Sequence, residues 1–349
     1  MAAVKYIDGP LLVLAGAGSG KTRVITQKIG YLINDCGYLP TSVCAVTFTN
    51  KAANEMRERV AGVLPAPQRR GLKIATFHTL GLTIIKRNLA QCSLKKGFSI
   101  FDSEDAMQII RGFLPANKAT DREVVSKIQN HISRWKNDLL APDDVLRQKC
   151  DLPLFEEAAM LYPRYVQALN AYNAVDFDDL LLTDHAEIRE HWQNKIRHLL
   201  VDEYQDSNTS QYLLVKLLTA VRARFTVVGD DDQSIYAWRG ARPENLQQLQ
   251  LDYPNLKMIK LEQNYRSTNI ILNAANHLIA HNQHLFEKNL WSDLGQGELL
   301  RVIRCKDEQD EAEQVVTDLI SHRMRQGTQY GEYAILYRGN HQSRIFEKV

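Results

Sequence analysis

Cysteine is scarce in this sequence, and the few cysteines are far apart. The five cysteines among 349 residues form no C-x-x-C pair, which is typical of thiols that serve as core residues in a reducing compartment. No apolar run approaches the roughly 20 residues that span a bilayer, and the opening MAAVKYIDGP has no apolar signal-peptide stretch. We therefore expect a cytoplasmic protein with no membrane partner.

Net charge is small as well, because 43 Lys and Arg residues against 41 Asp and Glu residues leave only +2. The total charge therefore does not indicate a nucleic-acid partner. The distribution is uneven, since no acidic residue lies between Glu58 and Asp102. Such a stretch is either a solvated surface or an anion-binding face. Its basic residues are Arg59, Arg69, Arg70, Lys73, Lys86, Arg87, Lys95 and Lys96.

The length and the apolar pattern predict more than one domain. A chain of 349 residues that is 44% hydrophobic and 24% charged fits two or three globular domains. Continuous apolar runs alternate with helical patterns, which predicts an α/β fold with a parallel sheet covered on both faces. The candidate strands are residues 11–15, 42–48, 72–77, 196–202, 224–230, 256–261, 299–304 and 333–338.

Residues 85–185 interrupt this alternation and have the pattern of helices only. The simplest architecture is a split α/β domain over residues 1–84 and 186–268, with a helical insertion subdomain at 85–185. After residue 268 a new helix and two strands predict the start of a second α/β unit, 269–349.

AGAGSGKT, residues 15–22, follows an apolar strand and precedes a helical pattern. The N–H groups of such a Gly-rich loop and helix N-terminus point at a bound phosphate. Ala15 stands where the pattern G-x-x-x-x-G-K-[ST] usually begins with glycine. Lys21 would contact the β- and γ-phosphates, and the Thr22 hydroxyl would bind Mg²⁺. The predicted nucleotide-binding residues here are Ala15, Gly16, Ala17, Gly18, Ser19, Gly20, Lys21 and Thr22.

HLLVDEYQD, residues 198–206, supplies the acidic partner that a phosphate loop needs. Asp202, at the end of an apolar strand, would bind Mg²⁺ through water. Glu203 would orient and deprotonate the attacking water. The alternative is an acidic turn with no catalytic role. Together with the phosphate loop, the pair predicts hydrolysis of a nucleoside triphosphate and not binding alone.

Six segments occur in the order of motifs I, Ia, Ib, II, III and IV of superfamily 1A DNA helicases. They are AGAGSGKT, AVTFTNKAANEM, TFHTLG, LLVDEYQD, VVGDDDQSIYAWRGA and LEQNYRST. The chain therefore resembles the UvrD/Rep/PcrA group over almost its whole length. The linking text, with WKNDL, VDFDDL and AILYRGNHQSR, is most similar to the Rep branch. The resemblance implies RecA-like P-loop NTPase domains, with ATP and Mg²⁺ bound between two of them.

The resemblance also implies roles for single residues. On the nucleotide side, Arg23 would be a further contact and Gln233 would sense the γ-phosphate. Tyr265 would stack on adenine, and Arg266 would act as an arginine finger. On the DNA side it implies strand contacts or base stacking by Phe48, Thr76, His78, Trp238 and Arg239.

GDDDQSIYAWRGA, residues 229–241, would begin beside ATP and end beside single-stranded DNA. Stacking of a base on Trp238 is worth about 1–3 kcal/mol. Trp238 lies only five positions after Gln233, so a shift at Gln233 should also move the stacked base. The segment is thus predicted to couple the two sites, unless Trp238 is a core aromatic. The three consecutive aspartates have two interpretations, a divalent-metal triplet or a negative loop that keeps DNA out of the ATP cleft.

The resemblance implies an ATP-dependent 3′-to-5′ translocase on single-stranded DNA that unwinds 3′-tailed or forked duplexes in replication or repair, with replisome proteins as further partners. The group's adenine-reading segment, N-P-x-Q-x-x-A-V, and its motifs V and VI are not found in this sequence. We therefore expect a fragment that hydrolyses ATP slowly and does not unwind DNA alone. Two alternatives stay open, the motor part of a helicase–nuclease subunit and, for the fragment itself, a DNA-binding module with little ATPase activity.

Overall fold

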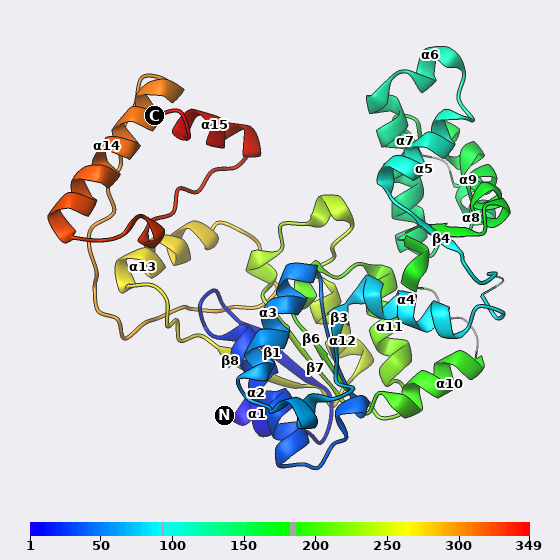
Figure 1. The fold of residues 1–349 in the computed structure, drawn as a ribbon, viewed down its shortest axis with the longest axis horizontal. Helices are drawn as coiled ribbons and strands as arrows, with labels where there is room; N and C mark the ends of the chain where they lie inside the picture. The colour runs from blue at the N-terminus through cyan, green and yellow to red at the C-terminus, as the bar shows by residue number, and fades with distance from the viewer. Residues whose placement is uncertain (93, 149, 177, 182–185) are drawn as a thin grey trace. The chain divides into compact units, whose positions relative to one another are not determined.

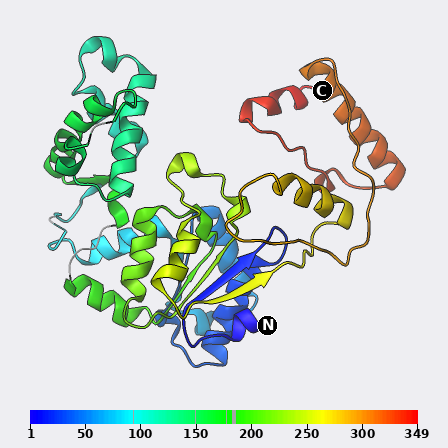
Figure 2. The ribbon, with the colours of Figure 1, turned by 180° about the vertical axis from the view of Figure 1, so that it is seen from behind.

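The computed structural model describes residues 1–92, 94–148, 150–176, 178–181 and 186–349, with the backbone only for Leu180, Leu181 and Arg239. Its contacts fall into two compact units, Met1–Gln296 and Gly297–Val349. Figures 1 and 2 show the first unit as a sheet between helices, with a further group of helices formed by the middle of the chain. Within the described ranges, no helix combines the length and apolar character that a membrane crossing requires.

A six-stranded sheet, parallel throughout, forms the centre of the first unit in the order β3-β2-β6-β7-β1-β8. Six apolar runs of the sequence form these strands, so the α/β fold class is confirmed. The strands are β1 (Leu11–Ala15), β2 (Val43–Thr47), β3 (Lys73–Thr76), β6 (His198–Val201), β7 (Phe225–Gly229) and β8 (Lys257–Leu261).

Helices cover both faces of the sheet, and burial along β1 shows why. Leu11 and Val13 belong to one buried cluster and Leu12 and Leu14 to the other, because side chains alternate along a strand. The first cluster includes residues of α1 (Ala2–Lys5), α2 (Lys21–Asn34) and α3 (Asn50–Ala61). The second includes residues of α4 (Phe77–Arg87), α10 (Ala186–Lys195), α11 (Thr209–Thr219) and α12 (Asn245–Asp252).

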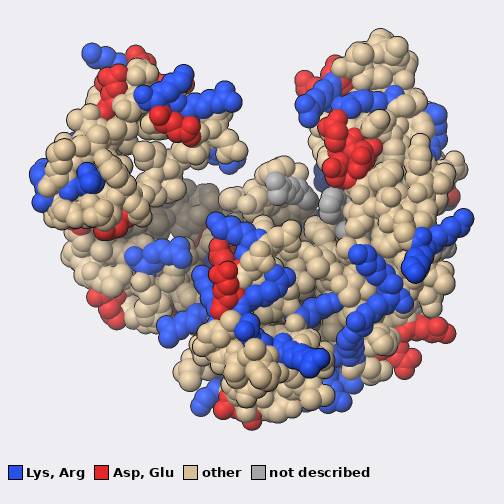
Figure 3. Space-filling model, viewed as in Figure 1, with Lys and Arg blue, Asp and Glu red and all other residues tan. Residues whose placement is uncertain are grey.

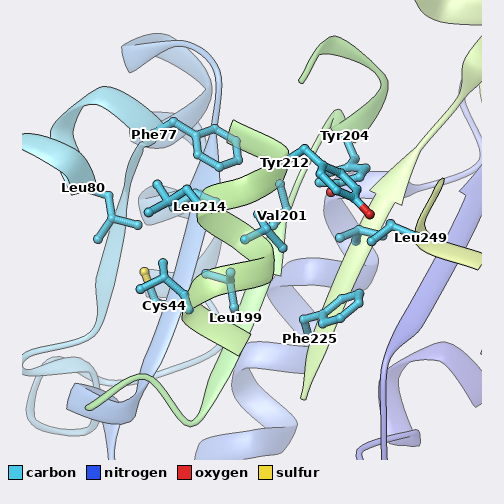
Figure 4. Packing of buried hydrophobic residues seen from close by; sticks show 14 of the residues in the cluster. Cys44, Phe77, Leu80, Leu199, Val201, Tyr204, Tyr212, Leu214, Phe225 and Leu249 are labelled. Carbon is cyan, nitrogen blue, oxygen red and sulfur yellow. The ribbon is translucent and has the colours of Figure 1, made fainter. Parts of the chain in front are cut away.

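The core on the second face is drawn in Figure 4. Phe77 of α4, Leu199 of β6, Leu214 of α11 and Phe225 of β7 belong to this single cluster, and each is at most 1% exposed. Burial of a side chain of this size stabilises the fold by about 1.5–3 kcal/mol. This packing fixes the strands on which the sequence motifs lie.

The residues between α4 and α10 form a group with its own buried core. One prediction is wrong here, since the group is not made of helices only: β4 and β5 pair as a small parallel sheet. Each of these strands has 3 residues, too few for an apolar run to be recognised. The elements are β4 (Ser99–Phe101), α5 (Ser103–Arg111), α6 (Ala116–Ala119), α7 (Arg122–Asn137), α8 (Pro142–Leu146), α9 (Phe155–Ala171), β5 (Ala174–Asp176) and η3 (Asp178–Leu181).

After β8, the first unit continues with α13 (Asn269–Ile279), and the second unit contains α14 (Glu308–Gln326) and α15 (Ser343–Phe346). The strands predicted at 299–304 and 333–338 are not formed. Val302 and Leu336, from these two segments, are each 93% exposed. A strand needs neighbours for its backbone hydrogen bonds, and an isolated pair is only marginally stable, so apolar composition alone does not produce strands here.

His198, the first residue of β6, makes the stability of the sheet sensitive to acid. Burial, and to a smaller extent the charges of Lys28 and Arg224, lower its pKa from 6.5 to about 3. Between pH 6.5 and about 3, His198 is therefore protonated in the unfolded chain but neutral in the folded chain. The stability of the fold decreases as the pH drops through this range. This group accounts for about 1.4 kcal/mol per pH unit. Urea unfolding at a series of pH values gives the free energy of unfolding. Below pH 6.5 this free energy should fall less steeply with pH for His198→Asn than for wild type. Equal slopes in the two proteins would contradict the assignment to His198.

Candidate functional site

The sequence motifs lie at the carboxyl ends of the six parallel strands. Because all six run in one direction, these ends share one edge of the sheet, where open α/β sheets bind their ligands. The segments that follow the strands are 16–20 after β1, 48–50 after β2, 77–79 after β3, 202–206 after β6, 230–233 after β7 and 262–267 after β8. The fold therefore gathers residues from both ends of the first unit into one site.

Glycine shapes the loop between β1 and α2. Gly18 and Gly20 have φ angles of +69° and +94°, which side-chain-bearing residues rarely adopt. A Cβ atom on Gly18 would also lie 2.5 Å from Asn264 Nδ2. Gly20 is the N-cap of α2 and offers no side-chain acceptor, so the first N–H groups of the helix are suited to bind an anion.

Lys21 is the first residue of α2, and its ammonium is buried. The residue is 9% exposed, and within the described ranges its Nζ atom has no hydrogen-bond partner. Glu203 Oε2 lies 3.7 Å from that nitrogen. A buried ammonium without an acceptor is costly, and a phosphate group in the loop would supply the acceptor. The loop thus fits the phosphates of a nucleotide.

Asp202 and Glu203 directly follow β6, beside Lys21. Burial, and then the charge of Glu203, raise the pKa of Asp202 to about 6 against opposing hydrogen bonds that include one with the Thr22 side chain. Glu203 has a φ of +51°, and backbone strain of this kind often occurs at functional sites. Its Oε2 atom accepts a hydrogen bond from Gln205 Nε2 at 3.0 Å. The Thr22 hydroxyl and the Asp202 carboxylate are oxygen ligands of the kind that Mg²⁺ prefers.

Two family models match nearly the whole chain. Residues 1–254 match the N-terminal domain of UvrD/REP helicases, and residues 259–349 match the UvrD-like helicase C-terminal domain. The chain belongs to the UvrD/Rep helicase family. The resemblance that the six motifs indicated is thereby confirmed.

Curated relatives in this family share much of the sequence. The chain is 55% identical to the ATP-dependent DNA helicase Rep of Escherichia coli (strain K12), over 99% of this chain and 52% of the relative. Identity to Rep of Buchnera aphidicola subsp. Schizaphis graminum (strain Sg) is 48%, over 99% and 54%. Identity to the ATP-dependent DNA helicase PcrA of Staphylococcus aureus (strain Mu50 / ATCC 700699) is 41%, over 99% and 48%. The chain therefore spans about half the length of the curated relatives it matches.

The remaining nucleotide-side residues of the family motifs lie at the same edge of the sheet. Gln233, in η5 (Asp231–Gln233), donates from Nε2 to the Asp230 carboxylate. The Tyr265 N–H donates to Gly18 O at 3.0 Å, and the residue is 64% exposed. Arg266 follows it, and Arg23 lies exposed on α2. The roles of these four side chains in binding or sensing ATP stay predictions.

The DNA-side residues after β2 and β3 are partly built into the core. The Phe48 ring centre lies 5.3 Å from that of Phe77, a core residue. Thr76 caps α4 by accepting a hydrogen bond from the Thr79 N–H at 3.1 Å. His78 lies in the first turn of α4, where burial lowers its pKa. Contact with DNA by Phe48, Thr76 and His78 stays a prediction.

Trp238 differs from these residues because it is open to solvent. It lies in η6 (Ala237–Arg239) with 72% of its surface exposed, so it is not a core aromatic. Its ring centre is 6.4 Å from that of Tyr236. For Arg239 only the backbone belongs to the described structure, and its side chain lies outside it. An exposed indole of this kind is suited to stack on a base.

The basic stretch is divided by the fold. Lys73 begins β3, and Thr76 ends it. Arg87 ends α4, and His78 lies in the first turn of that helix, so these two residues are roughly 14 Å apart along the helix axis. The cationic groups of Lys73, Arg87 and Lys195 lie 5.3, 5.6 and 4.8 Å from the ring centre of Trp192. In Figure 3, drawn in the view of Figure 1, the charged residues over the region of α4 are mostly Lys and Arg. Sequence proximity to the Thr76–His78 motif therefore does not place Lys73 and Arg87 beside it.

Two residues that complete the site are absent from the sequence predictions. Gln205, which is 2% exposed, accepts the Asp230 N–H at 3.0 Å through Oε1 and donates to Glu203 through Nε2. Asn264, also 2% exposed, donates to Ala17 O at 2.6 Å and so joins the loop after β1 to the segment after β8. Both lie inside motifs recognised from the sequence, and their contacts depend on the fold.

Proposed function

We propose that this chain binds single-stranded DNA and hydrolyses ATP as part of a 3′-to-5′ translocase that opens 3′-tailed or forked duplexes in replication or repair, and that it does not unwind DNA alone. The observation that supports this most is the 3.7 Å approach of Glu203 to the buried Lys21 ammonium, at the edge where six motifs meet. The relatives Rep and PcrA are named ATP-dependent DNA helicases, which supports the same activity.

On this proposal each nucleotide-side residue has one task. The loop N–H groups and Lys21 bind the β- and γ-phosphates. Thr22 and, through water, Asp202 would hold Mg²⁺, which when bound would supply positive charge beside the phosphate oxygens. Glu203 accepts the proton of the attacking water. Gln233 senses the γ-phosphate, and Tyr265 stacks on the adenine. Arg266 acts as an arginine finger, and Arg23 is a further nucleotide contact.

DNA binds, on the same proposal, at the strand ends next to the nucleotide. Trp238 stacks on a base, and Gln233 lies in the same short segment after β7, so movement of one end is transmitted to the other. The other strand contacts come from Phe48, Thr76, His78 and Arg239. Residues 1–84 and 186–268 form the motor domain, residues 85–185 its insertion, and residues 269–349 belong to a second motor domain.

The test is steady-state ATP hydrolysis by the 349-residue chain with and without oligo-dT. Wild type should hydrolyse ATP, and oligo-dT should raise the rate. Lys21→Ala should lose both, because the phosphates lose their cation. Trp238→Ala should keep the basal rate and lose most of the stimulation, since removal of one stacking platform weakens binding by about 1–3 kcal/mol.

Two results would contradict different parts of the proposal, ATP hydrolysis itself and its coupling to DNA. A wild-type rate equal to that of Lys21→Ala would show that this chain is not an ATPase. Full stimulation of Trp238→Ala would show that hydrolysis is coupled to DNA by another route than the segment after β7.

A further inference from the structure

The three consecutive aspartates after β7 surround one ammonium group. One carboxylate oxygen from each of Asp230, Asp231 and Asp232 lies within 4.8 Å of the others. Lys288 Nζ donates to Asp230 and Asp231 and lies 3.0 Å from Asp232 Oδ2. The side chains of Lys288, Asp230 and Asp231 are each only 4% exposed. The Lys288 ammonium thus supplies the positive charge at the centre of the three aspartates, which favours an internal ion-pair cluster over the divalent-metal interpretation.

The charges in this cluster depend on one another. Burial by itself would lower the pKa of Lys288, but the charges and hydrogen bonds of Asp230 and Asp231 raise it to about 12. Lys288 thus stays protonated, and it compensates carboxylates that water hardly reaches. Removal of one partner from a buried ionic cluster leaves the others uncompensated, which is strongly destabilising.

The same aspartates bind the backbone that carries Lys288. Asp231 Oδ2 accepts the N–H groups of Leu285 at 3.0 Å and Phe286 at 3.2 Å. Asp232 Oδ1 lies 2.9 Å from His284 Nδ1, and Phe286 is 8% exposed in the core of the sheet. The segment 284–288 is therefore attached to the loop 230–232 by both its backbone and its side chains.

A continuous series of contacts leads from Lys288 to the candidate base. Asp230 accepts from Lys288 through Oδ1 and from Gln233 through Oδ2. Its N–H donates to Gln205 Oε1 at 3.0 Å, and Gln205 Nε2 donates to Glu203 Oε2 at 3.0 Å. Asp230 thus joins Lys288 to both Gln233 and Glu203.

We propose that Lys288 is a positioning residue for ATP hydrolysis, which fixes the loop 230–233 so that Gln233 and Glu203 keep their places beside the nucleotide. The inference rests on the proposed function. Within the described residues, the polar contacts of the Lys288 ammonium are to the three carboxylates. Lys288 therefore acts on turnover and has little effect on ATP binding.

The first experiment compares Lys288→Met with Lys260→Met in steady-state ATP hydrolysis. Lys260 is a matched control because its Nζ donates to Glu287 O at 2.8 Å, in the same segment, and does not contact the aspartates. Lys288→Met should lower kcat by about tenfold or more and change the KM for ATP by less than about threefold, since a small displacement of catalytic groups is costly. Lys288→Arg, which keeps the charge, should recover much of kcat, and Lys260→Met should resemble wild type.

The results distinguish a failure of the inference about Lys288 from a failure of the proposed function. Hydrolysis by wild type with an unchanged kcat in Lys288→Met overturns the inference alone, and so does an equal loss in Lys260→Met. Wild type without hydrolysis contradicts the proposed function instead.

A second measurement does not depend on activity. Thermal unfolding of Lys288→Ala should begin at a lower temperature than that of wild type in EDTA, and Ca²⁺ should raise its Tm because the freed carboxylates become a cation site. Wild type should respond much less to Ca²⁺. A variant that melts like wild type in EDTA, or that ignores Ca²⁺, would overturn the view that Lys288 compensates the aspartates.

Discussion

Glu203→Gln is expected to lower the rate of ATP hydrolysis by about 10²–10⁴-fold, the contribution of a positioned general base. The amide keeps the shape of the side chain and can still accept a hydrogen bond from Gln205, but it cannot take the proton of the attacking water. Lys21 stays in place, so nucleotide binding should change little. The measurement is the single-turnover hydrolysis rate, together with the thermal stabilisation given by Mg–ADP.

Glu190→Gln is the matched control for this change. Glu190 is an exposed glutamate on α10, and its amide variant should hydrolyse ATP at the wild-type rate. If Glu203→Gln retained more than about a tenth of the wild-type rate, another group would have to be the base.

Lys136→Met is expected to lower the free energy of unfolding by about 3–5 kcal/mol, the usual result of removing one partner of a buried ion pair. Lys136 Nζ lies 2.6 Å from Asp176 Oδ2 and 2.8 Å from Asp179 Oδ1, and its side chain is 5% exposed. Burial alone would lower its pKa, but the two carboxylates raise it. Methionine would fill the space and leave both carboxylates without a cation.

Lys127→Met, on the same helix α7, is the control for this measurement. Lys127 pairs with Glu123 at 2.6 Å, but both side chains are more than half exposed, and such exposed pairs contribute little to stability. Urea unfolding followed by far-UV circular dichroism should separate the two variants. The deficit of Lys136→Met should shrink in acid, because protonation removes the uncompensated charge. A deficit equal to that of Lys127→Met would show that the pair is not structurally important.

Much of the fold could be predicted because the sheet is parallel and covered on both faces. Its strands are then continuous apolar runs, such as LLVLA at 11–15, and they are visible without knowledge of their neighbours. The run LLRVIR at 299–304 is also rich in leucine, valine and isoleucine and forms no strand, because pairing depends on partners that composition does not reveal. The opposite error concerns two strands that form but were not predicted, Ser99–Phe101 and Ala174–Asp176. A strand of three residues is too short to show a hydrophobic period.

The candidate site, too, could be predicted from the sequence only where its residues lie in local motifs. Lys21, Thr22, Asp202 and Glu203 lie in short segments whose spacing carries the chemistry, so a strand, a loop and a helix suffice to predict them. Lys288 has no such local pattern. Its role arises from contacts with Asp230 and Asp231, which are 58 and 57 positions away in the chain, and only the fold brings these residues together.

The strand order also has a consequence for how this protein emerges from the ribosome. β1 is made well before both of its neighbours, β7 and β8, with Leu11 opposite Thr226 and Lys257. At about 5–20 residues per second, roughly ten to forty seconds of translation separate them. Throughout that time the nascent chain carries an unpaired apolar strand while the helical group after α4 can already bury its own core. The nucleotide loop thus acquires its final shape only after β7 and β8 have been made, and chaperones that shield apolar segments would be needed most for β1 during that interval.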